Sequence, residues 1–101
     1  MIARTWHGRT KAEDADRYLE YLEATGLKDY GTVAGNLGVR ALRKVDGGIA
    51  DFLIVTYWES MDAVKRFAGE NPEVAVYYPE DDAFLLEKEP FVTHYDVVFE
   101  S

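Results

Sequence analysis

The feature that most constrains the fold is the stretch 52–58, which contains no charged side chain. Its mixture of aromatic, β-branched and aliphatic residues favours a β-strand. A strand with helices on one side and water on the other alternates apolar and polar residues with a period of two. The stretch does not alternate in this way, and it therefore predicts a strand that is covered on both faces.

Turn and cap signals divide the rest of the chain. Thr10 and Glu13 have the spacing of a capping box and predict the start of a helix. The turn at 46–48 is Asp-Gly-Gly, which favours a hairpin. Ser60 is a second helix cap, and Asn71 followed by Pro72 predicts the start of a further helix.

These signals predict one α+β domain over residues 1–101. The expected elements are, in order, strand 2–8, a helix from Thr10 to about Gly26, strands 36–45 and 49–59, helical pieces between 60 and 87, and strand 91–99. The order β-α-β-β-α-β is that of the ferredoxin-like arrangement, with helices on one face of a four-stranded antiparallel sheet.

A second copy of the chain is the simplest cover for the other face of that sheet. Strand 91–99 also carries apolar residues on both faces, with Val97 and Phe99 on one side and Val98 on the other. A 101-residue domain buries a modest share of its surface, and association is a common remedy. We therefore expect a homodimer.

Charge and composition exclude several classes of function. The chain has 19 acidic and 11 basic residues, a formal net charge of −8, which disfavours nucleic acid and anionic membranes as partners. There is no cysteine, and the two histidines fall on different faces of the predicted sheet, so no metal site is expected. With no apolar leader or membrane-spanning run, the expected location is cytoplasmic.

The first and last strands are neighbours in this arrangement, and their pairing predicts the candidate catalytic residues. If partners sum to about 100, Arg4 lies opposite Asp96 and Trp6 lies opposite His94. An arginine and an aspartate in buried strands favour an ion pair, either structural or placed to bind an anion. His94 is the candidate general base because its ordinary pKa is near neutrality.

Aromatic residues indicate where a ligand would bind. Trp58 and Phe67 would lie beside Tyr77 and Tyr78, which follow the second helical region. These side chains can be ordinary core or the wall of a pocket between sheet and helices. Prolines 72 and 79 break the helices above the sheet and are expected to leave room there. The acidic run 80–82 is expected to be the solvated first turn of a helix.

Four segments resemble the antibiotic biosynthesis monooxygenase superfamily: IARTW at 2–6, GNLGV at 35–39, YWES at 57–60 and THYDV at 93–97. The resemblance covers nearly the whole chain and implies a dimeric α+β barrel. Members include cofactor-free oxygenases of phenols, heme-degrading enzymes and isomerases. The heme-degrading markers are missing, because their tryptophan and histidine positions fall on Phe67 and near Tyr77 and residues 1–8 contain no asparagine.

The resemblance thus implies a cofactor-independent monooxygenase, or a related small enzyme, acting on an aromatic or enolic molecule. His94 or Tyr77 would take a proton, and Arg4 would hold the resulting anion. Trp6, Trp58 and Phe67 would exclude water. Two alternatives remain open: a non-catalytic dimer that binds a small molecule or a partner, and a heme-handling protein.

Overall fold

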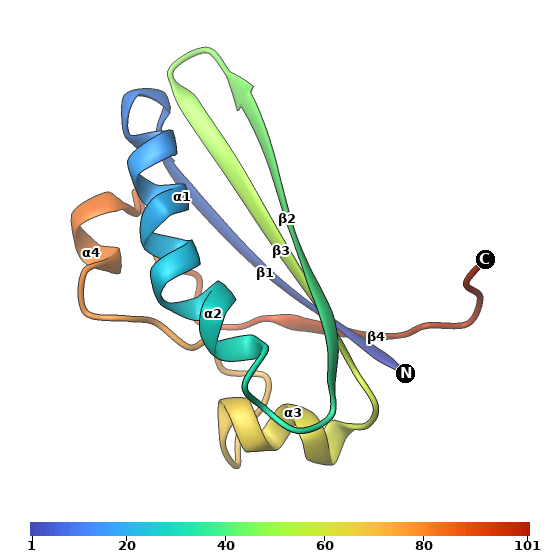
Figure 1. Ribbon diagram of the computed structural model, residues 1–101. Helices are drawn as coiled ribbons and strands as arrows, with labels where there is room; N and C mark the ends of the chain where they lie inside the picture. Colours follow the sequence, from blue (N-terminus) through green and yellow to red (C-terminus); the bar gives the residue numbers. More distant parts are fainter.

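The computed structural model describes residues 1–101 and contains the predicted four-stranded antiparallel sheet (Figure 1). The strands are β1 (Ile2–Lys11), β2 (Asn36–Asp46), β3 (Ile49–Trp58) and β4 (Thr93–Asp96). The helices are the 3-10 turn η1 (Ala12–Asp14), α1 (Ala15–Ala24), α2 (Gly26–Tyr30), α3 (Met61–Ala68) and α4 (Asp81–Phe84). The sheet order β2-β3-β1-β4 confirms the ferredoxin-like arrangement.

The helices all lie against one side of the sheet, here called the helix face (Figure 1). Antiparallel partners point to the same side of a sheet, and β1 pairs Ile2 with Trp58 and Trp6 with Ile54. The even-numbered residues of β1 and β3 therefore point to the helix face and are mostly buried. The odd-numbered residues point to the opposite side, here called the open face, which no helix covers.

An aromatic core fills the helix face. Trp58 is fully buried against Tyr30 and Phe67, with ring centroids 6.3 and 6.0 Å away. Tyr18 of α1 meets the edge of Phe52 at 5.2 Å. Edge-to-face and tilted ring pairs of this kind add to the free energy gained from apolar burial. The core thus fixes α1, α2 and α3 on β3.

The hairpin turn and one helix cap follow the sequence signals closely. Gly47 has φ 61° in the hairpin between β2 and β3, as the Asp-Gly-Gly turn predicts. Gly35 has φ 93°, and a Cβ there would lie 2.5 Å from that of Ala63. Ser60 caps α3, because its Oγ accepts a hydrogen bond from the Ala63 amide at 3.2 Å.

Other predicted boundaries are wrong. Thr10 does not cap a helix, because β1 continues to Lys11 and the Thr10 hydroxyl donates to the Lys11 carbonyl. The helix expected after Asn71 does not form, and residues 69–80 contain only an isolated bridge between Val74 and Phe91. β4 is also shorter than the predicted strand 91–99, and its last pair is Asp96 with Ile2.

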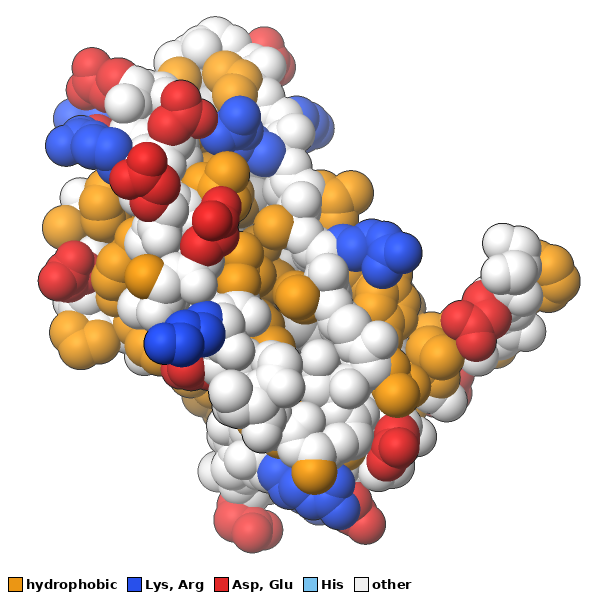
Figure 2. All heavy atoms as spheres, viewed as in Figure 1, with side chains coloured by type: hydrophobic (Ala, Val, Ile, Leu, Met, Phe, Trp, Pro, Cys, Tyr) orange, Lys and Arg blue, Asp and Glu red, His pale blue; other side chains and the backbone are white.

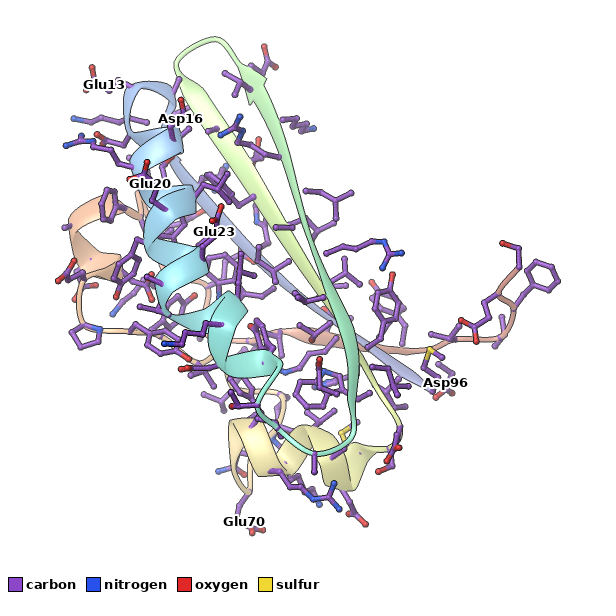
Figure 3. All side chains as sticks on the ribbon, viewed as in Figure 1. Glu13, Asp16, Glu20, Glu23, Glu70 and Asp96 are labelled. Carbon is purple, nitrogen blue, oxygen red and sulfur yellow. The ribbon has the colours of Figure 1, made fainter.

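The surface of α1 is strongly acidic. Asp16, Glu20 and Glu23 lie along its outward side (Figure 3), among the charged side chains that surround the helix in Figure 2. Asp16 accepts a hydrogen bond from Arg43 of β2 at 2.9 Å, which ties the helix to the hairpin.

None of the helices combines the length and the hydropathy that a membrane-spanning helix requires.

Asp81 corrects the expectation that residues 80–82 form a solvated first turn. Its side chain is only 4% exposed. One carboxylate oxygen accepts a hydrogen bond from the Tyr18 hydroxyl at 2.9 Å, and the other accepts one from the Tyr78 amide at 2.6 Å. The carboxylate therefore joins α1 to the segment that precedes α4.

We predict that Asp81→Ala lowers the free energy of unfolding by about 2–3 kcal/mol, because two buried hydrogen bonds to a charged acceptor are lost. Asp82→Ala is the matched control, since the neighbouring carboxylate is exposed and contacts only Lys88. Urea denaturation of both variants measures the difference. Equal losses from the two variants would contradict the assigned role of Asp81.

Candidate functional site

A buried arginine lies at the centre of the helix face. The side chain of Arg4 is 1% exposed and belongs to none of the ion pairs in the structure. Its Nη2 donates to the Pro72 and Val74 carbonyls at 3.4 and 3.3 Å. Its guanidinium carbon lies 5.6 Å from the centre of the Phe67 ring. Burial lowers the Arg4 pKa, and the neighbouring Tyr30 opposes this effect.

Three buried nitrogen atoms on this face have no hydrogen-bond partner: Arg4 Nε, Trp6 Nε1 and His94 Nε2. β4 places His94 directly opposite Arg4. Trp6 is the next residue of β1 on the same face. Unpartnered buried polar atoms are rare and costly, so three together indicate a place where a polar ligand or water belongs.

His94 remains a suitable base at neutral pH. Burial lowers its pKa, and the adjacent positive charge of Arg4 lowers it further. The neutral imidazole has one nitrogen that accepts, and Nε2 takes this role when the ring proton is on Nδ1. The side chain can therefore accept a proton from a group held beside Arg4.

The predicted partnership of Arg4 with Asp96 is wrong. The observed pairs of β1 and β4 sum to 98, so Arg4 lies opposite His94 and Asp96 lies opposite Ile2. The period-two pattern determines the face of each side chain but does not distinguish registers that differ by two residues. Asp96 is exposed at the end of the sheet near the N-terminus, away from the helices (Figure 3).

The two candidate tyrosines have structural partners. Tyr77 meets Trp6 edge-on, with centroids 6.1 Å apart, and its hydroxyl donates to the Glu89 carbonyl at 2.5 Å. Burial raises the Tyr77 pKa, which makes the phenol a poor base at neutral pH. Tyr78 donates from its hydroxyl to Asp29 at 2.8 Å, so it fixes the segment before α4 to α2.

An aromatic wall stands beside Arg4. Phe67 contacts Arg4 and packs on Trp58, whose Nε1 donates to the Thr56 hydroxyl at 2.8 Å. Tyr30 is a member that the sequence reasoning missed, with its ring 4.6 Å from that of Phe67. Tyr30 ends a five-residue helix, which is too short to show a helical period in the sequence. Its distance of one helical turn from Gly26, the other buried residue of α2, is the only sequence feature that places both on one side of the helix.

The space on the helix face is almost filled in this conformation. The cavity between sheet and helices measures about 20 Å³, room for one water molecule, and has Trp6, Tyr30 and Tyr78 in its wall. The expectation that broken helices leave a pocket here is therefore not met. Residues 70–79 pass over Arg4 and close the site instead.

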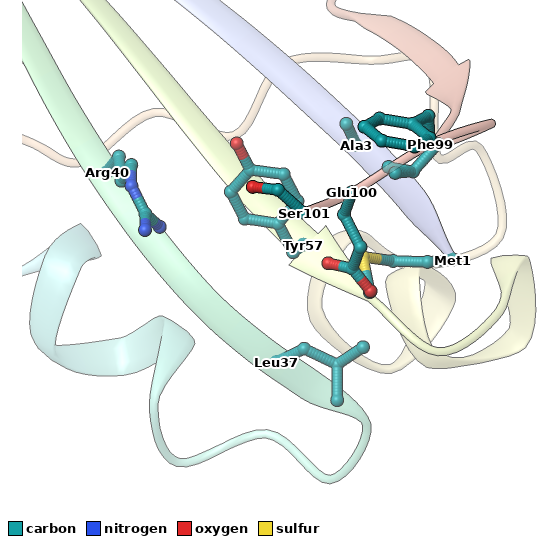
Figure 4. Close-up of a pocket in the computed structure, with 9 residues that line it drawn as sticks. Met1, Ala3, Leu37, Arg40, Tyr57, Phe99, Glu100 and Ser101 are labelled. Atoms are coloured by element: carbon teal, nitrogen blue, oxygen red, sulfur yellow. The ribbon is translucent and has the colours of Figure 1, made fainter.

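The larger hollows lie on the open face. One of about 760 Å³ is bounded by Met1, Leu37, Arg40 and Tyr57 and by the last residues of the chain (Figure 4). Another of about 510 Å³ lies at the hairpin end of the sheet, beside His7, Leu42 and Leu53.

His7 is placed differently from His94. On the open face its Nδ1 lies 2.5 Å from Glu89 and its Nε2 lies 3.0 Å from Asp51. These contacts raise the His7 pKa, with the Glu89 hydrogen bond as the main cause. The two carboxylates lie on opposite sides of the ring and cannot converge on one metal ion.

The residues present do not fit heme. Both nitrogens of His7 are engaged by carboxylates. His94 has a free Nε2, but residues 70–79 cover this part of the helix face, and the cavity of about 20 Å³ between sheet and helices has no room for a porphyrin in this conformation.

We predict opposite titrations for the two histidines, measured by NMR. The His7 pKa should lie above 6.5, so its contribution to stability is complete below that value and is lost as the pH rises through the folded-state pKa. The His94 pKa should lie below 6.5, so acidification through the ordinary value destabilises the fold. Two superimposable titration curves would contradict both environments.

Comparison with known proteins supports the fold. No family model and no curated protein matches the chain. The heme-degrader MhuD from Mycobacterium tuberculosis, solved with two hemes bound in its active site, is 20% identical, with a TM-score of 0.63 over 100% of this chain and 99% of that one. A putative antibiotic biosynthesis monooxygenase from Bacillus cereus is 21% identical, with a TM-score of 0.62 over 99% and 95%. Rv0793 from M. tuberculosis is 17% identical, with a TM-score of 0.62 over 100% and 99%. The chain therefore shares the ferredoxin-like fold of these proteins, the fold that its sequence resemblance implied.

Proposed function

We propose that the protein is a small cofactor-independent monooxygenase, acting on an aromatic or enolic molecule that binds as an anion beside Arg4. The observation that carries this proposal is a buried guanidinium without a counter-ion, together with three unpartnered buried nitrogens on the same face: its own Nε, Trp6 Nε1 and His94 Nε2. An oxyanion supplies the missing negative charge and accepts hydrogen bonds from Arg4 and Trp6. The shared fold with a putative monooxygenase supports the same reaction class.

Each residue then has a defined task. His94 removes a proton from the phenol or enol, because it is held neutral with a free ring nitrogen. Arg4 holds the resulting oxyanion. Trp6, Trp58 and Phe67 exclude water, which strengthens electrostatic interactions at the site. We assign Tyr77 to the wall rather than to proton transfer, because its hydroxyl is engaged and its pKa is raised.

The oxidation balances with dioxygen as the only co-reactant. Oxidation of a CH₂ group to C=O removes four electrons from the substrate, and O₂ takes up all four. One oxygen atom of O₂ enters the product, and the other leaves as water with the two hydrogens of that carbon. No external reductant is needed, since the substrate supplies all four electrons.

We also propose that the protein is a homodimer joined through the open face. Leu42, Leu53 and Tyr57 lie there without a helix to cover them. Beyond β4 the chain leaves the body (Figure 1), and Val98 and Phe99 are 92% and 84% exposed. A second copy would cover the apolar face and the projecting tail together, through a self-complementary contact.

The enzymatic proposal predicts oxygen consumption with anthrone, whose enol tautomer is a phenol and whose CH₂ group can be oxidised. His94→Gln should lower kcat by about 100-fold or more, the usual contribution of a general base. His7→Gln is the matched control, since this histidine lies on the open face, and its kcat should stay within about threefold of wild type. Saturable quenching of tryptophan fluorescence without oxygen uptake would favour the non-catalytic binding dimer instead.

The dimer is tested by two charged substitutions in β2. Leu42 pairs with Leu53 on the open face and is 48% exposed; Val45 pairs with Ala50 on the helix face and is 55% exposed. Leu42→Glu should give a monomer in light scattering at micromolar concentration, because a charge is costly in an apolar interface. Val45→Glu should remain a dimer. A monomeric wild-type protein would overturn the proposal.

A further inference from the structure

We propose that Arg4 is a two-pronged receptor for a planar carboxylate or chelating enolate, and that residues 70–79 occupy this receptor until the ligand displaces them. This inference rests on the proposed function only in taking Arg4 as the group that holds the anion. It goes beyond the proposed function by naming the class of oxyanion that binds and the segment that moves to admit it.

The free edge of the guanidinium defines the ligand. Nε–H and one N–H of Nη2 point in parallel along the same edge, the geometry that matches two oxygens of a carboxylate. Nε has no partner in the structure, and Nη2 makes only two long contacts, of 3.3 and 3.4 Å. Charge-assisted hydrogen bonds are typically about 2.7–2.9 Å, so this edge is poorly satisfied. A ligand with two adjacent acceptor oxygens would satisfy both donors.

The present occupants of Nη2 are main-chain carbonyls, from Pro72 and Val74. A carbonyl is neutral and leaves the buried positive charge without compensation. Both carbonyls lie within hydrogen-bond distance of Nη2, the nitrogen that a bidentate anion would use together with Nε, so the anion competes with them for the Nη2 hydrogens. Binding of the ligand and seating of the segment are therefore competitive.

Apart from the contacts with Arg4, few interactions hold residues 70–79 to the rest of the fold. Its backbone is held to the strand leading into β4 by two hydrogen bonds, Ala75 to Pro90 at 2.9 Å and Val92 to Glu73 at 2.8 Å. It begins after Gly69, which has φ 87°, and it is anchored again where Tyr78 bonds to Asp81 and Asp29. Between these limits there is no helix or strand of its own. Tyr77 adds its hydroxyl hydrogen bond to the Glu89 carbonyl and its edge contact with Trp6. A segment without regular secondary structure and with few backbone hydrogen bonds is of the kind that opens locally.

Displacement of residues 70–79 also explains how a ligand reaches a site that is filled in this conformation. The closed conformation holds a cavity of about 20 Å³ that Trp6 lines but Arg4 and His94 do not, far below the several hundred Å³ of ordinary small-molecule pockets. Lifting residues 70–79 would uncover Arg4, which bonds to Pro72 and Val74, and Trp6, which packs on Tyr77. His94 lies opposite Arg4 on the same face. The fraction of open molecules then scales the apparent affinity, so a looser segment should bind the ligand more tightly.

Salicylate is the probe, a planar ring with a carboxylate, and salicylamide is its neutral counterpart. Binding to the full-length protein is followed by tryptophan fluorescence, and opening by hydrogen exchange at the Ala75 and Val92 amides. We expect salicylate to bind at least tenfold more tightly than salicylamide and to speed exchange at both amides. Arg4→Lys, which keeps the charge but loses the parallel donors, should weaken salicylate binding by about tenfold or more.

A second pair of variants tests the competition without altering Arg4. Ala75→Pro removes the N–H that bonds to Pro90 and should tighten salicylate binding severalfold. Glu70→Pro is the control, since Glu70 is exposed and its N–H makes no hydrogen bond; its affinity should match wild type.

A further variant tests, with no ligand present, whether Arg4 holds residues 70–79 in the closed position. Arg4→Met should by itself speed exchange at Ala75 and Val92, a result independent of whether the protein oxidises anything. Slower exchange on salicylate binding, equal binding of salicylate and salicylamide, or unchanged exchange in Arg4→Met would overturn the inference. Failure of anthrone oxidation alone would overturn the proposed reaction but not this receptor.

Discussion

The burial of a single positive charge determines how the rest of this site is arranged. Arg4 occupies a strand position that points into an aromatic core, where a cation is expensive unless it is paired. The fold offers it a Phe67 ring and two carbonyls but no carboxylate. Burial lowers the pKa of His94, and the charge of Arg4 lowers it further, so the imidazole is neutral and able to accept a proton.

The two faces of the sheet have different roles. The helix face holds the aromatic core and the candidate site of Arg4, Trp6 and His94, which residues 70–79 cover. The open face carries exposed leucines, the large hollows and the paired His7, and it has no cover within one chain. We infer that association depends on the open face, whereas ligand binding depends on the helix face.

The sequence predicted the arrangement of the sheet because hairpin turns and strand periodicity are local signals, as at Gly47 and residues 52–58. It placed Arg4, Trp6 and His94 on one face for the same reason. It missed the Arg4–His94 pairing, since a two-residue shift leaves the periodicity unchanged. It also missed the buried Asp81 and the covering segment, because tertiary contacts rather than local propensity decide both.

The central claim is that Arg4 is retained for a ligand and not for the stability of the fold. Urea denaturation of Arg4→Met without ligand tests it most directly. Replacing a buried, unpaired charge by an apolar side chain of similar length should leave the free energy of unfolding within about 1 kcal/mol of wild type, or raise it. A loss of about 3–5 kcal/mol, the effect of breaking a buried ion pair, would show that the arginine is structural and would contradict the account.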